Sequence, residues 1–277
     1  MNVIEKMLWP FPGTKVGLCG RIMRSIGKRV IKVKEPGYFH RPKFTSVEKE
    51  RIVGAARHYF EHPLRSRVAE SLAKSQSSGA SWSDFHVLHQ YVMVKKPERV
   101  LELGSGVTSV VLASAFAELH AKGEKSGHVD SFEHLAEYHE DVKKVTPEDL
   151  KQFVTFYLSP MVSERWRELV PTVRYESLPK QKYQMAFIDG PPAGEVCTGD
   201  PLILASTAEE PVDFIIDRRK ATCLTLARWF PEGTVCFDYA RDLGLATVCR
   251  KTMLEQPRNW ASLPNRDALD FFGIRQD

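Results

Sequence analysis

Apolar and polar residues alternate along this chain with two periods, and these periods predict which elements follow one another. Val100, Leu101 and Leu103 form a short apolar run that predicts a strand. A Gly-Ser-Gly turn ends the run, and apolar residues then recur with helical spacing at Val107, Val110, Val111 and Ala113. The stretch from 99 to 113 is therefore predicted to fold as a strand, a tight loop and a helix.

The same alternation continues to the end of the chain. The pattern predicts strands at 128–133, 153–158, 183–189, 212–217, 234–239, 245–251 and 268–274, a small extra strand at 173–176, and helices at 84–94, 135–145 and 221–230. The strand at 183–189 is apolar on both faces, which is typical of the centre of a parallel sheet. These elements predict an α/β domain over residues 81–277.

Residues 1–80 are predicted to form a basic, mostly helical extension. Between 14 and 34 there are basic and apolar residues but no acid, a pattern that suits a membrane surface or polyanions. The alternative is a helix whose basic face is solvated and whose apolar face packs on its own domain. A second helix is predicted to begin with Thr45 as N-cap and Glu48 as its capping-box partner, and to end at His62 before Pro63.

Two pairs of histidines have helical spacing. His58 and His62 stand at i and i+4, but no third metal ligand is apparent in the sequence, so a surface or core role is favoured. His86 and His89 stand at i and i+3, where they could line a substrate pocket, with packing or exposure as the favoured alternative.

Composition disfavours some classes of partner and site but does not by itself indicate a function. The net charge of +4 and the pI near 8.7 do not by themselves imply a nucleic-acid partner. Five cysteines, with no C-x-x-C pair, argue for a reducing compartment and against a disulfide framework or a zinc site. The chain has no apolar run long enough to span a membrane and a poor match to a signal peptide, so we expect a cytoplasmic protein.

The loop after the first strand is predicted to bind a ligand. Gly104 and Gly106 allow backbone torsions closed to other residues and keep side chains away from a molecule lying across the loop. Thr108 and Ser109 add hydroxyls at the helix start, where unpaired N–H groups and the positive dipole end coincide. Neither the lysine of a phosphate loop nor the third glycine of a dinucleotide fingerprint follows, whereas an acid, Glu102, precedes the glycines.

Acids also end several other predicted strands, at the edge where open α/β sheets bind their ligands. Glu133 ends the strand 128–133, where a Rossmann-like domain places the acid that accepts hydrogen bonds from ribose hydroxyls. Asp189 ends the apolar strand and opens an Asp-Gly-Pro-Pro turn, Asp217 ends the similar strand 212–217, and Asp238 lies near the end of 234–239.

Four motifs together resemble a known family. Leu-Glu-Leu-Gly-Ser-Gly-Val-Thr-Ser, Ser-Phe-Glu-His, Leu-Ser-Pro-Met and Phe-Ile-Asp-Gly-Pro-Pro occur in the order and spacing of bacterial class I S-adenosylmethionine-dependent methyltransferases of the small-molecule O-methyltransferase type. The resemblance covers residues 81–242. It implies a Rossmann-like, seven-stranded mixed sheet with helices on both faces, whose last strand, here 268–274, is antiparallel at the edge.

The resemblance also implies roles for individual residues. S-adenosylmethionine would be bound by residues of the loop and of the second strand, namely Glu102, Gly104, Ser105, Gly106, Thr108 and Glu133. Ser159 stands nearest to the position of an adenine-contacting residue, which is often an Asp in the family. Asp189 would face the transferred methyl group or a metal.

Three points stay open in the sequence. Asp189 or Asp217 could end the family's fourth strand; the turn at Gly190 favours Asp189, and Asp217 could instead be a helix N-cap. Metal-dependent relatives hold Mg²⁺ with an acid after the fourth strand and Asp-Asp or Asp-Asn after the fifth, where we expect Asp238-Tyr239. One ligand is then missing, which favours a site without metal and leaves Mg²⁺ as the alternative. The general base could be Asp189, Asp238 or a helix histidine.

The predicted reaction is methyl transfer to a hydroxyl group of a small molecule or glycan. One alternative keeps the fold and cofactor but has an amine, a nucleic acid or a protein as acceptor, supported only by the basic segment and lacking an Asn-Pro-Pro-Tyr-like motif. The other is a non-catalytic interaction module that docks on a membrane or partner through that segment, against which the intact loop argues.

Overall fold

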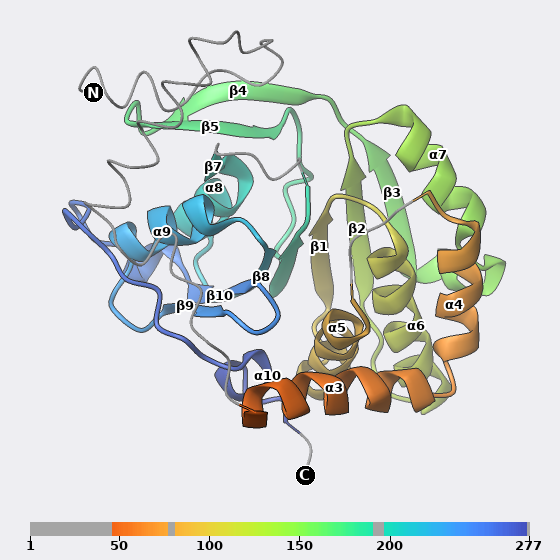
Figure 1. Cartoon of the computed structure of the whole chain (residues 1–277). Coiled ribbons are helices and arrows are strands. Elements are labelled where there is room, and N and C mark those ends of the chain that lie inside the picture. Colours follow the sequence, from red (N-terminus) through yellow and green to blue (C-terminus); the bar gives the residue numbers. More distant parts are fainter. Residues whose placement is uncertain (1–45, 77–80, 191–196, 276–277) are drawn as a thin grey trace, which may run out of the picture.

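A seven-stranded sheet forms the centre of the molecule (Figure 1). The computed structural model describes residues 46–76, 81–190 and 197–275. The sheet has the order β3-β2-β1-β6-β8-β10-β9 and consists of β1 (Arg99–Leu103), β2 (His128–Glu133), β3 (Val154–Leu158), β6 (Met185–Ile188), β8 (Val212–Asp217), β9 (Val235–Asp238) and β10 (Leu243–Val248). Only β10 is antiparallel to its neighbours within this sheet. The predicted Rossmann-like, mixed, seven-stranded sheet is thus confirmed.

The antiparallel strand is not the one that was predicted. Residues 268–274 were expected to be an edge strand, but they contain the short helix α10 (Ala268–Phe271). The Asp267 carboxylate caps this helix by accepting a hydrogen bond from the backbone N of Leu269 at 3.0 Å. Leu269 and Phe272 are buried, so the apolar run covers the sheet instead of extending it. A short apolar run suits either role. The antiparallel strand is β10, which lies between β8 and β9.

Helices cover both faces of the sheet, because successive strand residues point to opposite sides. On one side Val100, Met185 and Phe187 pack with α5 (Trp82–Lys95) and α6 (Val107–Ala121). On the other side Leu101 and Ile188 pack with α8 (Gly199–Thr207) and α9 (Lys220–Trp229).

Within residues 46–76, two helices precede α5 and pack against the first of these layers. They are α3 (Ser46–Glu61), which lies along the bottom of Figure 1, and α4 (Arg65–Lys74). Tyr59 of α3 is fully buried beside Phe85 of α5, with ring centroids 6.1 Å apart. The helix predicted to end at His62 is therefore present. Its predicted N-cap, Thr45, and the basic segment 14–34 lie outside the described residues.

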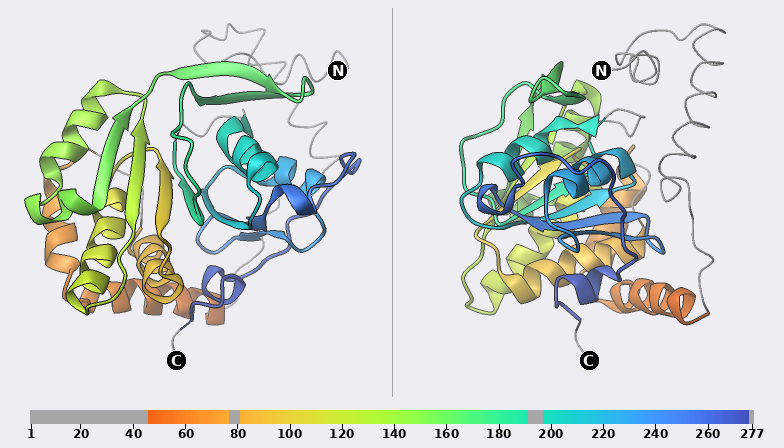
Figure 2. Two further views of the ribbon diagram at one scale, coloured as in Figure 1. Left: turned by 180° about the vertical axis from the view of Figure 1, so that it is seen from behind. Right: turned by 90° about the vertical axis from the view of Figure 1, so that its left-hand side faces the viewer.

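A small second sheet follows β3 in the chain. It contains the antiparallel hairpin of β4 (Met161–Trp166) and β5 (Val170–Tyr175), to which β7 (Cys197–Thr198) adds in parallel. In Figure 1 and Figure 2 the hairpin runs across the top of the molecule, from β3 toward α8. The sequence predicted only a strand at 173–176, so β4 was missed. The elements not yet named are α7 (Ala136–Val145), η1 (Glu148–Phe153) and η2 (Arg250–Thr252).

Within the described ranges, no helix combines the length and apolarity needed to cross a membrane.

Candidate functional site

The loops after β1 and β6 touch backbone to backbone at the carboxyl edge of the sheet. Gly104 has φ +93°, and a Cβ placed there would lie 2.6 Å from the carbonyl carbon of Asp189. The backbone N of Asp189 donates to the carbonyl oxygen of Leu103 at 2.7 Å, and the backbone N of Gly104 donates to that of Phe132 at 2.8 Å. Position 104 therefore excludes any side chain, and the course of the loop is fixed by strands on both sides.

Glu102 stabilises this loop through buried hydrogen bonds to its surroundings. Its carboxylate is fully buried and accepts hydrogen bonds from the hydroxyls of Thr108 at 2.6 Å, Ser131 at 2.6 Å, and Ser109. Ser131 is the residue directly opposite Glu102 in the parallel pairing of β1 and β2. Ser105 joins the same network through a hydroxyl contact with Ser131 at 2.7 Å. Both carboxylate oxygens are thus used to tie β1, β2 and the start of α6 together.

Burial changes the acidity of this carboxyl group. Loss of solvent raises the pKa of Glu102 to about 7, and the three hydroxyl donors offset only part of that effect. The negative charge of the Asp189 carboxylate also raises the pKa of Glu102. Glu102 therefore titrates near neutral pH.

Glu133 ends β2, the strand next to the glycine loop. Its Oε1 accepts hydrogen bonds from the backbone N of His134 at 2.7 Å and of Leu135 at 2.9 Å, and His134 Nδ1 lies 2.8 Å away. Burial raises the pKa of Glu133, but these hydrogen bonds outweigh burial and hold it below its usual value. The group is therefore an anion at neutral pH. Ser159, which follows β3, donates its backbone N–H to the carbonyl of Glu133 at 2.9 Å.

Asp189 follows β6, which pairs directly with β1, so it ends the strand beside the glycine loop. Asp217 ends β8, the next strand outward. Between them lies Arg219, whose side chain is only 4% exposed. Its Nη1 lies 3.4 Å from Asp189 Oδ1 and donates to the carbonyl of Asp217 at 2.6 Å, while Nη2 donates to the carbonyl of Asp189. One guanidinium thus links the ends of both strands.

The two acids influence each other. Burial, followed by the Asp189 carboxylate, raises the pKa of Asp217 to about 8. The Asp189 side chain is 36% exposed, whereas Asp217 is buried. Asp217 therefore retains its proton at neutral pH.

The strand beside β6 in the large sheet is β8, and this corrects the sequence-based expectation for the metal ligands. The residues after the fifth strand of the sheet are Arg218 and Arg219, not Tyr239. Arg218 stands where metal-dependent relatives have a second acid or an amide after the fifth strand, so one oxygen ligand is missing. The Arg219 guanidinium also lies against Asp189, and burial keeps Asp217 protonated, so this set of residues is a poor fit for a Mg²⁺ ion, which requires oxygen ligands.

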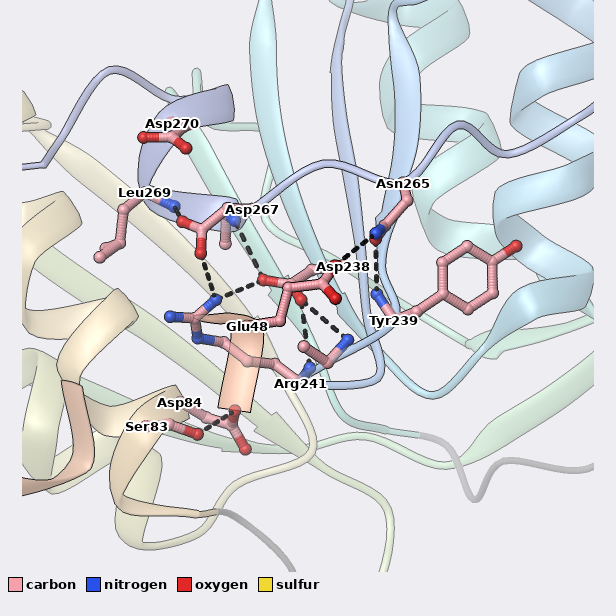
Figure 3. A network of polar contacts seen from close by, with 12 residues as sticks. Glu48, Ser83, Asp84, Asp238, Tyr239, Arg241, Asn265, Asp267, Leu269 and Asp270 are labelled. Atoms are coloured by element: carbon pink, nitrogen blue, oxygen red, sulfur yellow. Dashed lines mark hydrogen bonds and ion pairs between the residues drawn. The ribbon is translucent and has the colours of Figure 1, made fainter. Parts of the chain in front are cut away.

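Asp238 lies apart from this site, at the end of β9 (Figure 3). Its Oδ2 accepts from Arg241 Nη1 at 2.6 Å and from the backbone N of Ala268 at 3.0 Å, and its Oδ1 accepts from the backbone N of Ala240 and Arg241. Arg241 also binds Asp267 at 3.0 Å. Three strand spacings, about 14 Å, separate the ends of β9 and β6. The structure therefore does not bring together Asp189 and Asp238, the two predicted catalytic acids.

The helix histidines also lie away from these strand ends. His89 pairs with Glu118 at 3.1 Å, and Glu118 stands eleven residues into α6, about 16 Å along its axis from the glycine loop. The His86 ring contacts the His58 ring, with centroids 4.9 Å apart. Neither His86 nor His89 is placed to act on a ligand at the loop.

The sequence missed two residues of the site. Ser131 was read only as part of a strand, because its position opposite Glu102 depends on the register of two strands far apart in the chain. Arg219 follows the possible helix N-cap Asp217 in the sequence, and its proximity to Asp189 depends on the adjacency of β6 and β8. In the sequence, the only indication that Arg219 belongs to the site is its position two residues after Asp217, an acid that ends a predicted strand.

Comparison with known proteins finds fold likeness without sequence relatives. No protein-family model matches the chain, and no curated protein matches its sequence. Among solved structures, the O-methyltransferase TomG from Streptomyces achromogenes is 15% identical, with 62% of this chain and 74% of that one covered and a TM-score of 0.40.

Two further solved structures also match most of this chain at low sequence identity. The O-methyltransferase from Bacillus cereus is 12% identical, with 69% and 71% covered and a TM-score of 0.38. The cofactor-bound protein Rv0187 from MTB is 11% identical, with 75% and 99% covered and a TM-score of 0.46. At these identities the likeness concerns the fold and not the function of this chain.

Proposed function

We propose that the chain is an S-adenosylmethionine-dependent methyltransferase whose acceptor is a hydroxyl group of a small molecule or glycan. One observation carries the proposal. The ionised carboxylate of Glu133 ends a strand beside the loop at Gly104, where there is no room for a side chain. The acid pair Asp189 and Asp217 ends the next strands along the same edge. This is the edge at which open α/β sheets bind their ligands.

The residues at this edge fit the parts of the proposed cofactor. Gly106 precedes α6 and has no side chain to cap it, so the N–H groups of the first turn suit an anionic group such as a carboxylate. Glu133 Oε1 is held by the loop that follows, which orients the carboxylate to accept hydrogen bonds from ribose hydroxyls. Glu102 acts indirectly, because all its hydrogen bonds go to the first turn of α6 and to β2.

The proposed reaction depends more on aligning the acceptor with the methyl group than on activating the methyl donor. When bound, the cofactor supplies an electrophilic methyl group on a sulfonium. The chain holds the acceptor oxygen in line with that methyl group, and good alignment contributes on the order of 7–11 kcal/mol to lowering the barrier. A hydroxyl acceptor must also lose a proton.

We assign the proton-accepting role to Asp189, with Asp217 as its partner. Asp189 is partly exposed at the loop contact, whereas burial and the Asp189 carboxylate raise the pKa of its neighbour Asp217. Arg219 holds the two strand ends together and keeps a positive charge beside the carboxylates. Asp238 is a poorer candidate, because both its oxygens are engaged by backbone N–H groups and Arg241.

The proposal is tested by transfer of labelled methyl groups from S-adenosylmethionine to pooled acceptors: phenols, sugars, amines, nucleic acids and proteins. Wild type should label a hydroxyl-bearing small molecule or glycan, with and without EDTA. Asp189→Asn should lose transfer while retaining cofactor binding, and Asp149→Asn, an exposed acid on η1, should retain both. Labelling of another acceptor class would redefine the substrate. Cofactor binding without transfer to any class would favour the interaction module.

A further inference from the structure

A second cluster of chemically active side chains lies at the opposite end of α6 from the glycine loop. Glu118 Oε2 lies 3.1 Å from His89 Nε2 and 3.6 Å from His62 Nε2. The ligand atoms of all three residues lie within 4.8 Å of one another. His62 follows α3, His89 belongs to α5 and Glu118 to α6, so three separate segments converge on one point.

The spacing of these atoms suits a tetrahedral metal ion. Bonds of about 2.0–2.2 Å to Zn²⁺ place neighbouring ligand atoms about 3.3–3.6 Å apart. The separations of 3.1 Å and 3.6 Å need only small adjustments to reach this geometry, and the two histidine nitrogens, which lie within 4.8 Å of each other, would move together on binding. Two imidazoles and one carboxylate are also a known three-ligand set for zinc, in which a water molecule completes the coordination.

The surroundings hold the three groups in place. Glu118 Oε1 is bound by Lys122 Nζ at 2.7 Å, which turns Oε2 toward the histidines. Tyr59 packs against both imidazoles, with ring centroids 5.9 Å from His62 and 5.5 Å from His89. Such outer contacts orient the ligands of metal sites. The His89 side chain is 3% exposed, and those of His62 and Glu118 are 17% and 21% exposed, so water can reach one side of the cluster.

We propose that His62, His89 and Glu118 bind a divalent transition-metal ion, with Zn²⁺ as the ion that best suits this ligand set. His62 Nδ1 accepts a hydrogen bond from the backbone N of Leu64 at 3.2 Å. Coordination through Nε2 places the ring proton on Nδ1 and releases that hydrogen bond. Each histidine binds as a neutral imidazole and the glutamate as a carboxylate.

The ion would clamp the α3–α4 pair onto the sheet domain. Because His62 lies between α3 and α4, it is the only one of the three ligands outside residues 81–277. This role is structural and does not depend on the proposed methyl transfer.

Tag-free, full-length protein, purified without chelators, tests the site by elemental analysis. After EDTA treatment and its removal, calorimetric titration with ZnCl₂ measures affinity, and the visible bands of added Co²⁺ report tetrahedral coordination. Wild type should bind one ion per chain. His62→Gln and Glu118→Gln should weaken binding at least about tenfold, remove the Co²⁺ bands, and abolish the rise in melting temperature on adding Zn²⁺.

His58→Gln is the matched control. His58 stands one turn earlier on α3 and its ring faces His86, outside the cluster. The proposal predicts unchanged zinc binding in this variant. Absence of zinc binding by folded wild type would overturn the proposal, as would equal binding by wild type and His62→Gln. Because His62 is partly exposed, its variant should retain the wild-type circular dichroism spectrum.

Discussion

Arg219 Nη1 lies 3.4 Å from Asp189 Oδ1, and the same guanidinium binds the backbone carbonyls at the ends of both β6 and β8. Arg219→Gln removes a buried guanidinium and leaves these carbonyls without their donor, while its charged partner Asp189 is partly exposed. We expect it to lower the free energy of unfolding by about 1–3 kcal/mol, measured by urea denaturation. Arg218→Gln changes a neighbouring side chain that is 50% exposed, and should cost less than about 1 kcal/mol. Equal losses would show that the Arg219 bridge contributes little.

Gly104 and Gly233 separate two effects of a glycine. Both have positive φ, +93° and +83°, but a Cβ at Gly104 would meet the chain at Asp189, whereas one at Gly233 would meet nothing within 4 Å. Gly233→Ala should therefore cost only about 1 kcal/mol of stability through backbone strain. Gly104→Ala should cost clearly more and should also abolish binding of S-adenosylmethionine. Chemical denaturation and calorimetry measure both effects, and normal cofactor binding by Gly104→Ala would contradict the close approach of the two loops.

The stability of the fold should depend on pH through Glu102. Its pKa rises from 4.5 to about 7 on folding, so the folded state binds the proton more tightly. The resulting stabilisation is fully present below pH 4.5 and is lost as the pH rises through about 7, a change on the order of 3 kcal/mol. Glu102→Gln, which cannot ionise, should remove this part of the fall from urea denaturation curves recorded across the pH range, whereas the part that comes from the raised pKa of Asp217 should remain.

Glu133 provides the control of opposite sign. Its folded pKa is lowered, so its contribution is present above the unfolded pKa and is lost as the pH falls. Glu133→Gln should flatten the acid side of the profile and leave the fall toward pH 7 intact. If Glu102→Gln kept the wild-type slope between pH 4.5 and 7, the buried Glu102 would not be its source.

Asp238 should matter for stability. Arg241 is 1% exposed and lies between Asp238 and Asp267, so Asp238→Asn leaves a buried charge with one fewer counter-charge. We expect a loss of about 3–5 kcal/mol in urea denaturation, with cofactor affinity unchanged wherever the variant is folded. Asp270→Asn, whose parent side chain is 47% exposed, should be nearly neutral. Loss of cofactor binding by folded Asp238→Asn would instead connect this network with the site.

Local sequence patterns predicted those parts of the fold that depend on neighbours in the chain. The strand 128–133 and the turn at Gly104 follow directly from apolar runs and glycine, and the structure has both. The run 268–274 was assigned wrongly, because its apolar residues suit a strand or a helix and only its packing against the sheet decides. The division into an extension, 1–80, and a domain, 81–277, stays a prediction.

Contacts between distant segments could not be predicted in this way. The pairing of Glu102 with Ser131 depends on strand register, and that of Arg219 with Asp189 depends on strand order. The sequence offered His62 without a third metal ligand, since His89 and Glu118 come from later helices. In each case the sequence shows which residues are present, but only the fold shows that they lie close together.

Calorimetric titration of the purified protein with S-adenosylmethionine and S-adenosylhomocysteine tests the central claim most directly. Glu133→Ala removes the carboxylate at the end of β2, and Glu137→Ala removes an exposed acid one turn further on, in α7. The account predicts binding by wild type and Glu137→Ala and its loss in Glu133→Ala. No binding by well-folded wild type, or equal binding by all three proteins, would contradict the proposed cofactor site.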